Sequence, residues 1–551
     1  MKKCLFVLVA LIVGCSVRET PEPKQITGNI SIIPHPLSIG RLPGEFLLTP
    51  DTKIVASDDA GMRLASRLNE ELRNNLGFEL GMTDDADAAD AITFATLPNE
   101  AISNPEEYLL RVESEHIRII GSERGMFYGI QSLVKLLNLE SKGTVTIPAA
   151  EIYDAPRFRY RGMHLDVSRH FMSVDFVKKY IRLLSQYKFN YFHWHLTDDQ
   201  GWRIEIKKYP RLTEIGSKRP ETVLEKNYHP YIGDRIPVEG FYSQEEIREI
   251  VKYAKERYVT IVPEIDLPGH SSAALASYPQ FGCKKVYPYR VKTTWGAFPD
   301  VYCPTEETFQ FIQDVLGEVI DLFPESPYLH IGGDEIIADH WKESAFVQGL
   351  KKTENLKTER EVQDWFLQRV ESYVRSRGKT IIGWDELLDG KVSASATIMS
   401  WRGMEAGIRA AKSHHETIMA PDSFAYFDHP QDQPGNEPLS LGNPVPIEKV
   451  YSFEPVATGI SHEDAKYILG AEGCVWTEFI RGPKNVEYMA FPRAIALAEV
   501  LWSPVAVRNY EDFSDRLAVE LLRLDRQIVN YRNPKHAVVS PKSKDHRNRK
   551  S

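Results

Sequence analysis

Hydrophobic and polar positions divide the chain into two regions of different pattern. In residues 31–155, short runs of alternating apolar and polar residues are interleaved with two segments of helical periodicity, which is typical of a small α/β domain. In residues 156–535, short apolar runs alternate with helical segments. The pattern therefore predicts two domains of different architecture.

The second region contains eight apolar runs of the length expected for buried strands, most of them followed by a helical segment. We expect strands at 162–168, 191–198, 260–268, 328–335, 380–387, 396–403, 417–428 and 468–478. Two late helical patterns, 488–501 and 513–529, are expected to complete this domain. Eight strand-helix units predict a (β/α)8 TIM barrel, so the fold class is α/β, with a small α/β domain before the barrel.

Polar and aromatic residues collect at the carboxyl ends of these runs, where a TIM barrel carries its reactive groups. They are Arg169, His170, Asp198, Asp199, His270, Asp334, Glu335, Trp384, Asp385, Glu386, Trp401, Arg402, Tyr426, Asp428, Trp476 and Glu478. The sequence thus predicts one site at this end of the barrel.

Asp334 and Glu335 are adjacent and follow two glycines, Gly332 and Gly333. Neighbouring residues of a regular strand point to opposite faces, so we expect the glycines to bend the chain until both acids face the pocket. A glycosidase with two protein carboxylates needs them about 5 to 9.5 Å apart on opposite faces of the sugar. Adjacent acids do not fit that plan easily, which points to a nucleophile supplied by the substrate.

Three tryptophans at strand ends, Trp384, Trp401 and Trp476, lie beside polar residues and favour an aromatic pocket for a sugar ring. The pair His193 and His195 could belong to a metal-dependent hydrolase, but the fifth and sixth strands offer tryptophans in place of further ligands. We interpret the histidines as structural and predict neither a metal nor another cofactor.

Charge and length limit the remaining classes. A net charge of −10 over 551 residues lacks the basic footprint of a nucleic-acid binder. The basic tail, 536–551, is expected to be a disordered, solvated end. Cys283 and Cys303 bracket a loop and could form a disulfide, whereas Cys474 is expected to be a buried thiol.

The first residues resemble a bacterial lipoprotein signal. Two lysines precede an apolar run that is too short to span a membrane and ends at Gly14-Cys15. This resemblance implies a signal peptide at 1–15, lipidation of Cys15, a tether at 16–30, and anchoring in the bacterial envelope, facing the periplasm or the cell surface. An ordinary secretory signal is the alternative. We expect no other membrane contact.

Several motifs together resemble a known family. They are LDVSRHF (165–171), HLTDDQGWRIEI (195–206), PEIDLPGH (263–270) and HIGGDE (330–335), followed by GWDE, SWRG, AYFD and VWTE. Over residues 30 to 505 the chain resembles family 20 glycoside hydrolases, the exo-acting β-N-acetylhexosaminidases. The resemblance implies retaining hydrolysis of terminal β-linked GlcNAc or GalNAc, in which the 2-acetamido oxygen of the substrate attacks its own anomeric carbon and forms an oxazolinium.

The resemblance also implies roles for individual residues. Glu335 would protonate the leaving oxygen and then activate water, while Asp334 would orient the acetamido N–H and balance the positive intermediate. For substrate binding it implies Arg169, Asp428 and Glu478 for hydroxyls, Tyr426 for the acetamido oxygen, Trp384, Trp401 and Trp476 as walls, and Asp198 with His270 as a pair supporting Glu335. For Asp199, both a structural and a functional role remain open.

Three alternatives remain at this point. One is a retaining glycosidase that pairs Glu335 with Glu264 or Glu386. Another is a member of the same family that releases disaccharides. The third is a surface glycan-binding lipoprotein without catalysis.

Overall fold

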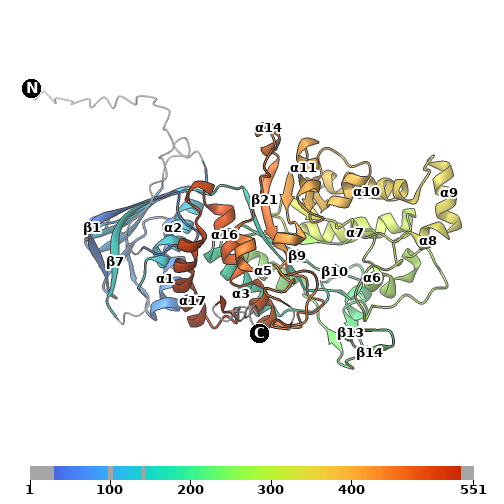
Figure 1. Cartoon of the computed structure of the whole chain (residues 1–551), viewed down its shortest axis with the longest axis horizontal. Helices are drawn as coiled ribbons and strands as arrows, with labels where there is room; N and C mark the ends of the chain where they lie inside the picture. The colour runs from blue at the N-terminus through green and yellow to red at the C-terminus, as the bar shows by residue number, and fades with distance from the viewer. Residues whose placement is uncertain (1–29, 97–103, 139–142, 434, 535–551) are drawn as a thin grey trace, which may run out of the picture.

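The computed structural model of the chain describes residues 30–96, 104–138, 143–433 and 435–534 (Figure 1). The expected signal peptide with Cys15, the tether up to residue 29 and the basic tail lie outside the described residues. No helix among the described residues is long and apolar enough to cross a membrane.

The N-terminal domain is a seven-stranded sheet with helices α1 (Asp59–Leu76) and α2 (Glu123–Lys135) on one face (Figure 1). Its strand order is β1-β7-β5-β6-β4-β2-β3. The strands are β1 (Ser38–Leu48), β2 (Lys53–Val55), β3 (Gly81–Thr83), β4 (Ala91–Thr96), β5 (Tyr108–Val112), β6 (His116–Gly121) and β7 (Val145–Asp154). Side chains directed from this sheet toward the helices, such as Ile117 and Ile119, are fully buried, which explains the alternating pattern of the sequence.

The second domain is a closed barrel of eight parallel strands, which confirms the predicted fold class. The strands are β8 (Tyr160–Asp166), β9 (Tyr191–His195), β16 (Thr260–Glu264), β17 (Tyr328–His330), β18 (Thr380–Trp384), β19 (Thr397–Ser400), β20 (Thr417–Met419) and β21 (Ile468–Gly473). All eight end earlier than predicted. The apolar and aromatic residues beyond each strand leave the ladder and form the loops that carry the site.

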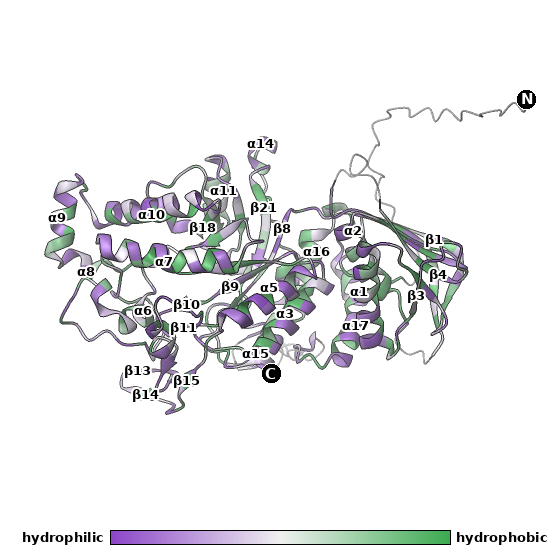
Figure 2. Cartoon of the chain, turned by 180° about the vertical axis from the view of Figure 1, so that it is seen from behind, coloured by the Kyte–Doolittle hydropathy of each residue, from purple (hydrophilic) through white to green (hydrophobic). Residues whose placement is uncertain are grey.

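Helices surround the barrel with one apolar face directed inward, and in Figure 2 they show hydrophilic and hydrophobic residues along the same helix. The main ones are α3 (Val174–Gln186), α5 (Gln244–Lys255), α7 (Glu306–Leu322), α10 (Glu359–Ser376), α11 (Met404–Lys412) and α16 (Arg493–Trp502). The helix α5 starts at a complete capping box of Ser243 and Glu246.

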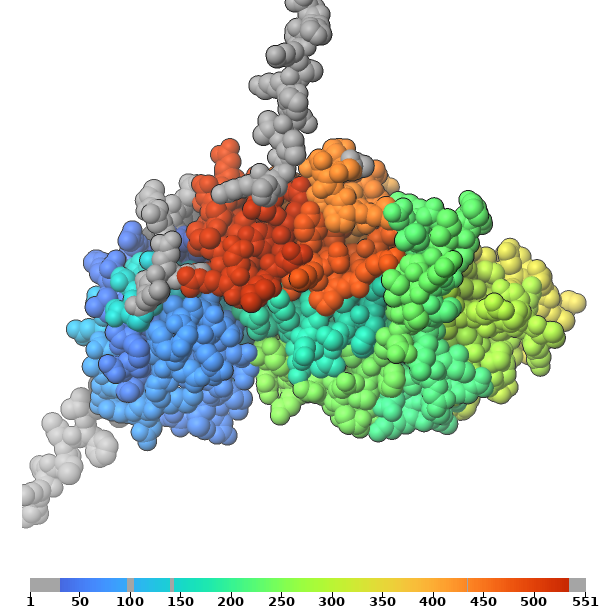
Figure 3. Space-filling view, turned by 90° about the horizontal axis from the view of Figure 1, so that it is seen from below, coloured from blue at the N-terminus to red at the C-terminus, as the bar shows by residue number. Residues whose placement is uncertain are grey.

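One prediction for the last helices was wrong. The pattern 488–501 is split into α15 (Pro483–Ala490) and α16 at Pro492, whose nitrogen has no hydrogen to donate to a continuous helix. The last helix, α17 (Tyr510–Arg526), also contacts the N-terminal domain, where Arg523 Nη2 donates to the Lys135 carbonyl at 2.8 Å. Figure 3 shows the corresponding contact between the N-terminal and C-terminal parts of the chain.

The long loops carry short elements of their own. They are β10 (Thr197–Asp198), β11 (Gly201–Trp202), α4 (Arg211–Glu214), β12 (Lys218–Arg219), β13 (Val223–Tyr228), β14 (Tyr231–Gly233), β15 (Val238–Glu239), α6 (Ser272–Ser277), α8 (Asp339–Lys342), α9 (Ala345–Thr353), α12 (Asp422–Ala425), α13 (Ile447–Tyr451) and α14 (His462–Ala465). A disulfide joins Cys283 and Cys303 across the loop after α6, and Cys474 is a buried free thiol.

Candidate active site

A pocket of ≈ 160 Å³ opens at the carboxyl end of the barrel. It is lined by Arg169, His270, Asp334, Glu335, Trp384, Trp401, Tyr426, Asp428, His429, Leu441, Trp476 and Glu478. Asp198, on the short strand after β9, lies directly behind this lining and contacts Arg169 and His270. All eight strands therefore contribute a predicted site residue to one place.

The two glycines before Asp334 turn the chain as predicted. Gly332 and Gly333 have φ angles of 65° and 96°, and Glu335 itself has a φ of 47°. A Cβ atom at Gly332 would lie 1.8 Å from Asp266 Oδ1, so only glycine fits there. The turn brings both Asp334 and Glu335 to the pocket, whereas a regular strand would point one of them away.

The two adjacent acids have different environments. The side chain of Asp334 is 16% exposed and that of Glu335 is 46% exposed. Asp334 Oδ1 is buried and has no hydrogen-bond partner among the residues that the structure describes, and burial raises the pKa of Asp334 to about 7. Such an oxygen is placed to accept a hydrogen bond from a ligand, whereas the exposed Glu335 is placed to exchange protons at the pocket mouth.

His270 links these acids to the residues behind the pocket. Its Nδ1 lies 3.1 Å from Asp198 Oδ1, and its Nε2 lies 3.7 Å from Asp334 Oδ2 and 3.9 Å from Glu335 Oε2. Burial opposes the charged ring, but the surrounding carboxylates, Asp198 first, raise the pKa of His270 well above its ordinary value. The predicted pairing of His270 with Asp198 is present, and the raised pKa favours a charged ring beside both acids.

Asp199 has mainly a structural position. Its Oδ1 accepts from the backbone N–H of Ser272 at 2.9 Å and from the Ser272 hydroxyl at 2.5 Å, at the start of α6. Its Oδ2 also lies 3.3 Å from His270 Nδ1. Asp199 therefore holds the loop that carries His270 and is not part of the pocket lining.

Arg169 is fixed by several partners at one end of the pocket. Its Nη2 lies 2.7 Å from Asp198 Oδ2, its Nη1 lies 3.2 Å from Asp166 Oδ2, and its Nε donates to Gln200 Oε1 at 3.0 Å. Glu478 Oε1 lies further away, at 3.8 Å from Nη1. A guanidinium held in this way can present its remaining N–H groups to hydroxyls with little loss of conformational entropy.

Asp428 and Glu478 form a second acidic part of the pocket lining. Burial and the nearby Glu478 carboxylate raise the pKa of Asp428 well above its ordinary value. Asp428 Oδ1 is buried and has no hydrogen-bond partner in the described part of the chain. These oxygens are therefore suited to hydroxyl groups of a neutral ligand.

The aromatic residues stand as walls around this space. The ring centroids of Trp384 and Trp476 are 5.7 Å apart, and the nearly parallel rings of Trp401 and Tyr426 are 6.2 Å apart. Trp401 Nε1 donates to Glu386 Oε2 at 3.0 Å, which fixes the indole. The arrangement suits a ring with one apolar face.

Several residues of the site were not predicted in the roles that the structure gives them. Asp166 and Gln200 position Arg169, Asp266 packs against the Gly332 turn, and Glu386 orients Trp401. All four lie inside motifs that carry the resemblance, so the signal was present in the sequence. Leu441 also lines the pocket, but it belongs to an irregular segment with no periodic pattern.

Comparisons with known proteins agree with this geometry. The family model "Glycosyl hydrolase family 20, catalytic domain" matches residues 158–505, and "Glycosyl hydrolase family 20, domain 2" matches residues 29–155. A beta-hexosaminidase of Porphyromonas gingivalis is 39% identical over 542 residues, which cover 96% of this chain and 68% of that protein.

Solved structures give the same result. A GH20 exo beta-N-acetylglucosaminidase of Vibrio harveyi in complex with N-acetylglucosamine is 35% identical, with a TM-score of 0.82, covering 93% of this chain and 80% of that one. An N-acetyl-beta-hexosaminidase of Streptomyces plicatus is 30% identical, with a TM-score of 0.79 and coverage of 92% and 97%.

Proposed function

Because this chain belongs to glycosyl hydrolase family 20, it is a glycoside hydrolase that removes terminal N-acetylhexosamine, and we propose how its own residues carry out the reaction. In the first step the acetamido oxygen of the substrate attacks the anomeric carbon while Glu335 gives its proton to the departing glycosidic oxygen. In the second step Glu335 takes a proton from water, and the water oxygen opens the oxazolinium. Two inversions at one carbon retain the β configuration.

Asp334 supplies the electrostatic part of this mechanism. Its unpartnered Oδ1 accepts the acetamido N–H, and its negative charge balances the oxazolinium as this forms. This is the single observation that carries the proposal: a carboxylate with one buried oxygen that has no hydrogen-bond partner among the described residues lies next in sequence to an exposed carboxylate in an aromatic pocket. A sugar without the acetamido group has no N–H to donate to Asp334.

The remaining pocket residues bind one terminal sugar. Arg169, Asp428 and Glu478 bind its hydroxyls, Tyr426 donates to the acetamido oxygen, and the three tryptophans enclose the ring and the acetamido methyl. A volume of ≈ 160 Å³ is below the range of about 300 to 1,000 Å³ that is usual for ligand pockets, which favours release of a monosaccharide over a disaccharide. GlcNAc, the sugar bound in the Vibrio harveyi relative, is the first substrate to test.

The alternative mechanism, in which a second protein carboxylate is the nucleophile, has little support in the geometry. Glu264 is fully buried and does not line the pocket. Glu386 is held by the Trp401 indole and by its proximity to Arg402. Neither carboxylate is free to attack a sugar opposite Glu335.

The test compares nitrophenyl β-N-acetylglucosaminide with nitrophenyl β-glucoside and analyses the products from defined oligosaccharides. We expect cleavage of the N-acetyl substrate alone and release of single sugars from the non-reducing end. Equal rates on the two glycosides would overturn the substrate-assisted mechanism, and release of disaccharides would overturn the exo-monosaccharide assignment. Binding of chitobiose without turnover would favour the non-catalytic alternative.

We further propose that Cys15 carries a lipid that anchors the enzyme in the bacterial envelope. The support is the sequence of residues 1–15, with two lysines, a short apolar run and Gly14-Cys15. Labelling with radioactive palmitate should mark the wild type and not a Cys15→Ser variant, and the variant should leave the membrane fraction. Labelling of both proteins, or of neither, would contradict the anchor.

A further inference from the structure

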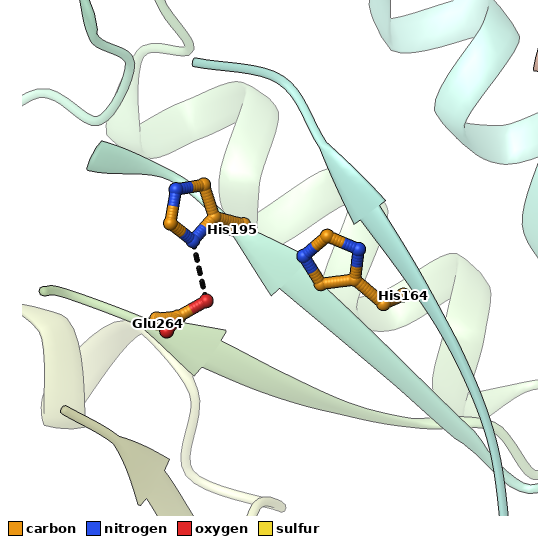
Figure 4. A group of neighbouring side chains, drawn as sticks. All are labelled: His164, His195 and Glu264. Atoms are coloured by element: carbon orange, nitrogen blue, oxygen red, sulfur yellow. Dashed lines mark hydrogen bonds and ion pairs between the residues drawn. The ribbon is translucent and has the colours of Figure 1, made fainter. Parts of the chain in front are cut away.

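The interior of the barrel holds a layer of charged side chains beneath the active site. Glu264 on β16 lies among histidines from neighbouring strands and is fully buried. Its Oε2 accepts a hydrogen bond from His195 Nδ1 and lies 3.1 Å from His193 Nε2, while its Oε1 lies 2.8 Å from His330 Nδ1. Figure 4 shows the contact between His195 and Glu264, with His164 on the adjacent strand.

The contacts continue in both directions from Glu264. On one side, His193 Nδ1 lies 2.8 Å from Glu472 Oε1, and Glu472 Oε2 accepts from the Tyr160 hydroxyl at 2.5 Å. On the other side, His195 Nε2 lies 2.9 Å from Asp198 Oδ2, and Asp198 Oδ1 lies 3.1 Å from His270 Nδ1. We call the series Glu472, His193, Glu264, His195, Asp198 and His270 the interior ion chain.

Carboxylates and imidazoles alternate along the interior ion chain. His193 and His195 each have one ring nitrogen beside one carboxylate and the other ring nitrogen beside a second carboxylate. An ionised carboxylate only accepts, so this placement favours a proton on each of these nitrogens and hence an imidazolium ring, although the contact from His193 Nε2 to Glu264 is an ion-pair distance and not a hydrogen bond. Although burial opposes the charge, Glu472 and Glu264 raise the pKa of His193 to about 9.

We propose that the interior ion chain holds His270 as an imidazolium beside the catalytic acids, and that Glu264 and His195 are positioning residues for the reaction proposed above. Neither side chain lines the pocket. They act through Asp198, because His195 helps to keep this carboxylate ionised and Asp198 keeps the His270 ring charged and oriented. The positive ring then favours the ionised form of Asp334 at the moment when the oxazolinium requires it.

Other titratable groups face these two histidines, and all of them except Glu335 are buried or largely buried. The carboxylate of Asp166 on β8 acts on His195 from the neighbouring strand and is paired with Arg169. Around His270 the additional carboxylates are Asp199, Asp266, Asp334 and Glu335. Burial and the charge of Asp334 raise the pKa of Asp266 well above its ordinary value, so Asp266 is a weaker ionic partner of the ring than Asp198.

A bound cation is the competing explanation for such a cluster, and the hydrogen bonds argue against it. Within the described ranges, three groups come close enough together to hold a metal ion: His164, His195 and Glu264; His193, Glu264 and His330; and Asp198, Asp266 and His270. However, His164 Nδ1 accepts the backbone N–H of Val475 at 3.2 Å, so the neutral ring carries its proton on Nε2 and has no free lone pair. His330 Nδ1 accepts the backbone N–H of Gly332 at 3.1 Å in the same way, and both ring nitrogens of His193 and His195 and the Nδ1 of His270 lie beside carboxylates.

Neutron diffraction from crystals of the deuterated full chain at pH 7 tests the proposal without reference to activity. We expect deuterium on both ring nitrogens of His193, His195 and His270, and on one ring nitrogen of His164. A single deuterium on any of the first three rings would overturn the proposal. An anomalous X-ray peak among these side chains, indicating a metal, would overturn it as well.

Kinetics of His195→Gln test the consequence for the reaction. The variant removes one positive charge beside Asp198, so the acidic limb of kcat/KM should move upward by about one pH unit. The matched control is His415→Gln, a buried histidine outside the interior ion chain whose Nδ1 lies 3.1 Å from the Ala396 carbonyl oxygen. The control should leave the limb in place.

A folded His195→Gln protein with an unmoved acidic limb would overturn the positioning role even if kcat fell. If His195→Gln does not fold, the neutron result on the wild type still decides. If the wild type does not cleave N-acetyl substrates, the proposed function fails, whereas the protonation states remain measurable and are judged separately.

Discussion

Replacing Asp334 with asparagine removes one negative charge and keeps the size of the side chain. In the wild type this charge lies beside the acetamido group and the developing oxazolinium. Two unit charges about 4 Å apart interact by roughly 4 kcal/mol at an effective dielectric constant near 20. That energy corresponds to a loss of about 10³-fold in kcat/KM, which is of the size seen when a preorganised group of this kind is removed.

The pH at which the variant is assayed matters. Because burial raises the pKa of Asp334 to about 7, the carboxylate of the free wild-type enzyme gains its proton as pH falls through about 7. The kcat/KM of the wild type should therefore decrease below that pH, and the pH profile of Asp334→Asn should lack this decrease. The ratio of wild type to variant should be largest at pH 8 and should shrink toward pH 5.

The assay is the hydrolysis of nitrophenyl β-N-acetylglucosaminide between pH 5 and 9, with nitrophenyl β-glucoside as the second substrate. Any residual cleavage of the glucoside should be unaffected, because it has no acetamido group to orient. Asp339→Asn is the matched control, since this carboxylate is exposed and pairs only with Lys342 at the surface. A loss below tenfold at pH 8, or an equal loss on both substrates, would refute the reasoning.

Three further predictions follow from the same contacts. Folding raises the pKa of Asp334 from 3.8 to about 7, so the folded protein binds the proton of this carboxyl more tightly than the unfolded chain does. The wild type therefore loses stability as pH rises from about 4 to about 7. At pH 8, Asp334→Asn should be more stable than the wild type by up to about 4 kcal/mol. Denaturant titrations at pH 4 and pH 8 check this, and equal stability at pH 8 would contradict it. Glu335→Gln should lower kcat/KM, which reports on the first step, by about 10² to 10⁴ for chitobiose and by much less for a dinitrophenyl glycoside, whose leaving group needs no proton; equal losses of kcat/KM for the two substrates would contradict the role of general acid. Replacing both Cys283 and Cys303 with alanine should lower the free energy of unfolding by about 3 kcal/mol, because the bridge closes a loop with a sequence separation of 20 residues; an unchanged unfolding midpoint would contradict this.

The sequence alone predicted much of the fold and of the site. Hydrophobic periodicity is local, and it identified eight strands and most of the surrounding helices. The ends of the strands were predicted too late, because residues such as Trp401 and Tyr426 are as apolar as strand residues although they belong to the loops. Likewise, the break at Pro492 was missed within an otherwise continuous helical pattern.

The site residues were predicted because their motifs follow the strands in a fixed order, and the barrel brings all of these strand ends together. The bend at Gly332 and Gly333 was predicted from the conflict between adjacent acids and the alternation of a strand. The different environments of Asp334 and Glu335 were not, since burial and unpaired oxygens depend on side chains from other strands.

Sequence by itself thus determined the barrel, the place of the acidic pair Asp334-Glu335 at the end of a strand, and the family, because these depend on periodicity and on short motifs. Only the tertiary structure decided which side chains meet inside the barrel. His193, Glu264 and Glu472 are far apart along the chain and carry no local signal of their contact. Closing β9, β16 and β21 into one barrel brings them within hydrogen-bond distance. Because water is excluded there, the protonation state of each side chain depends on its neighbours, and this dependence sets the charge of His270 beside the active site.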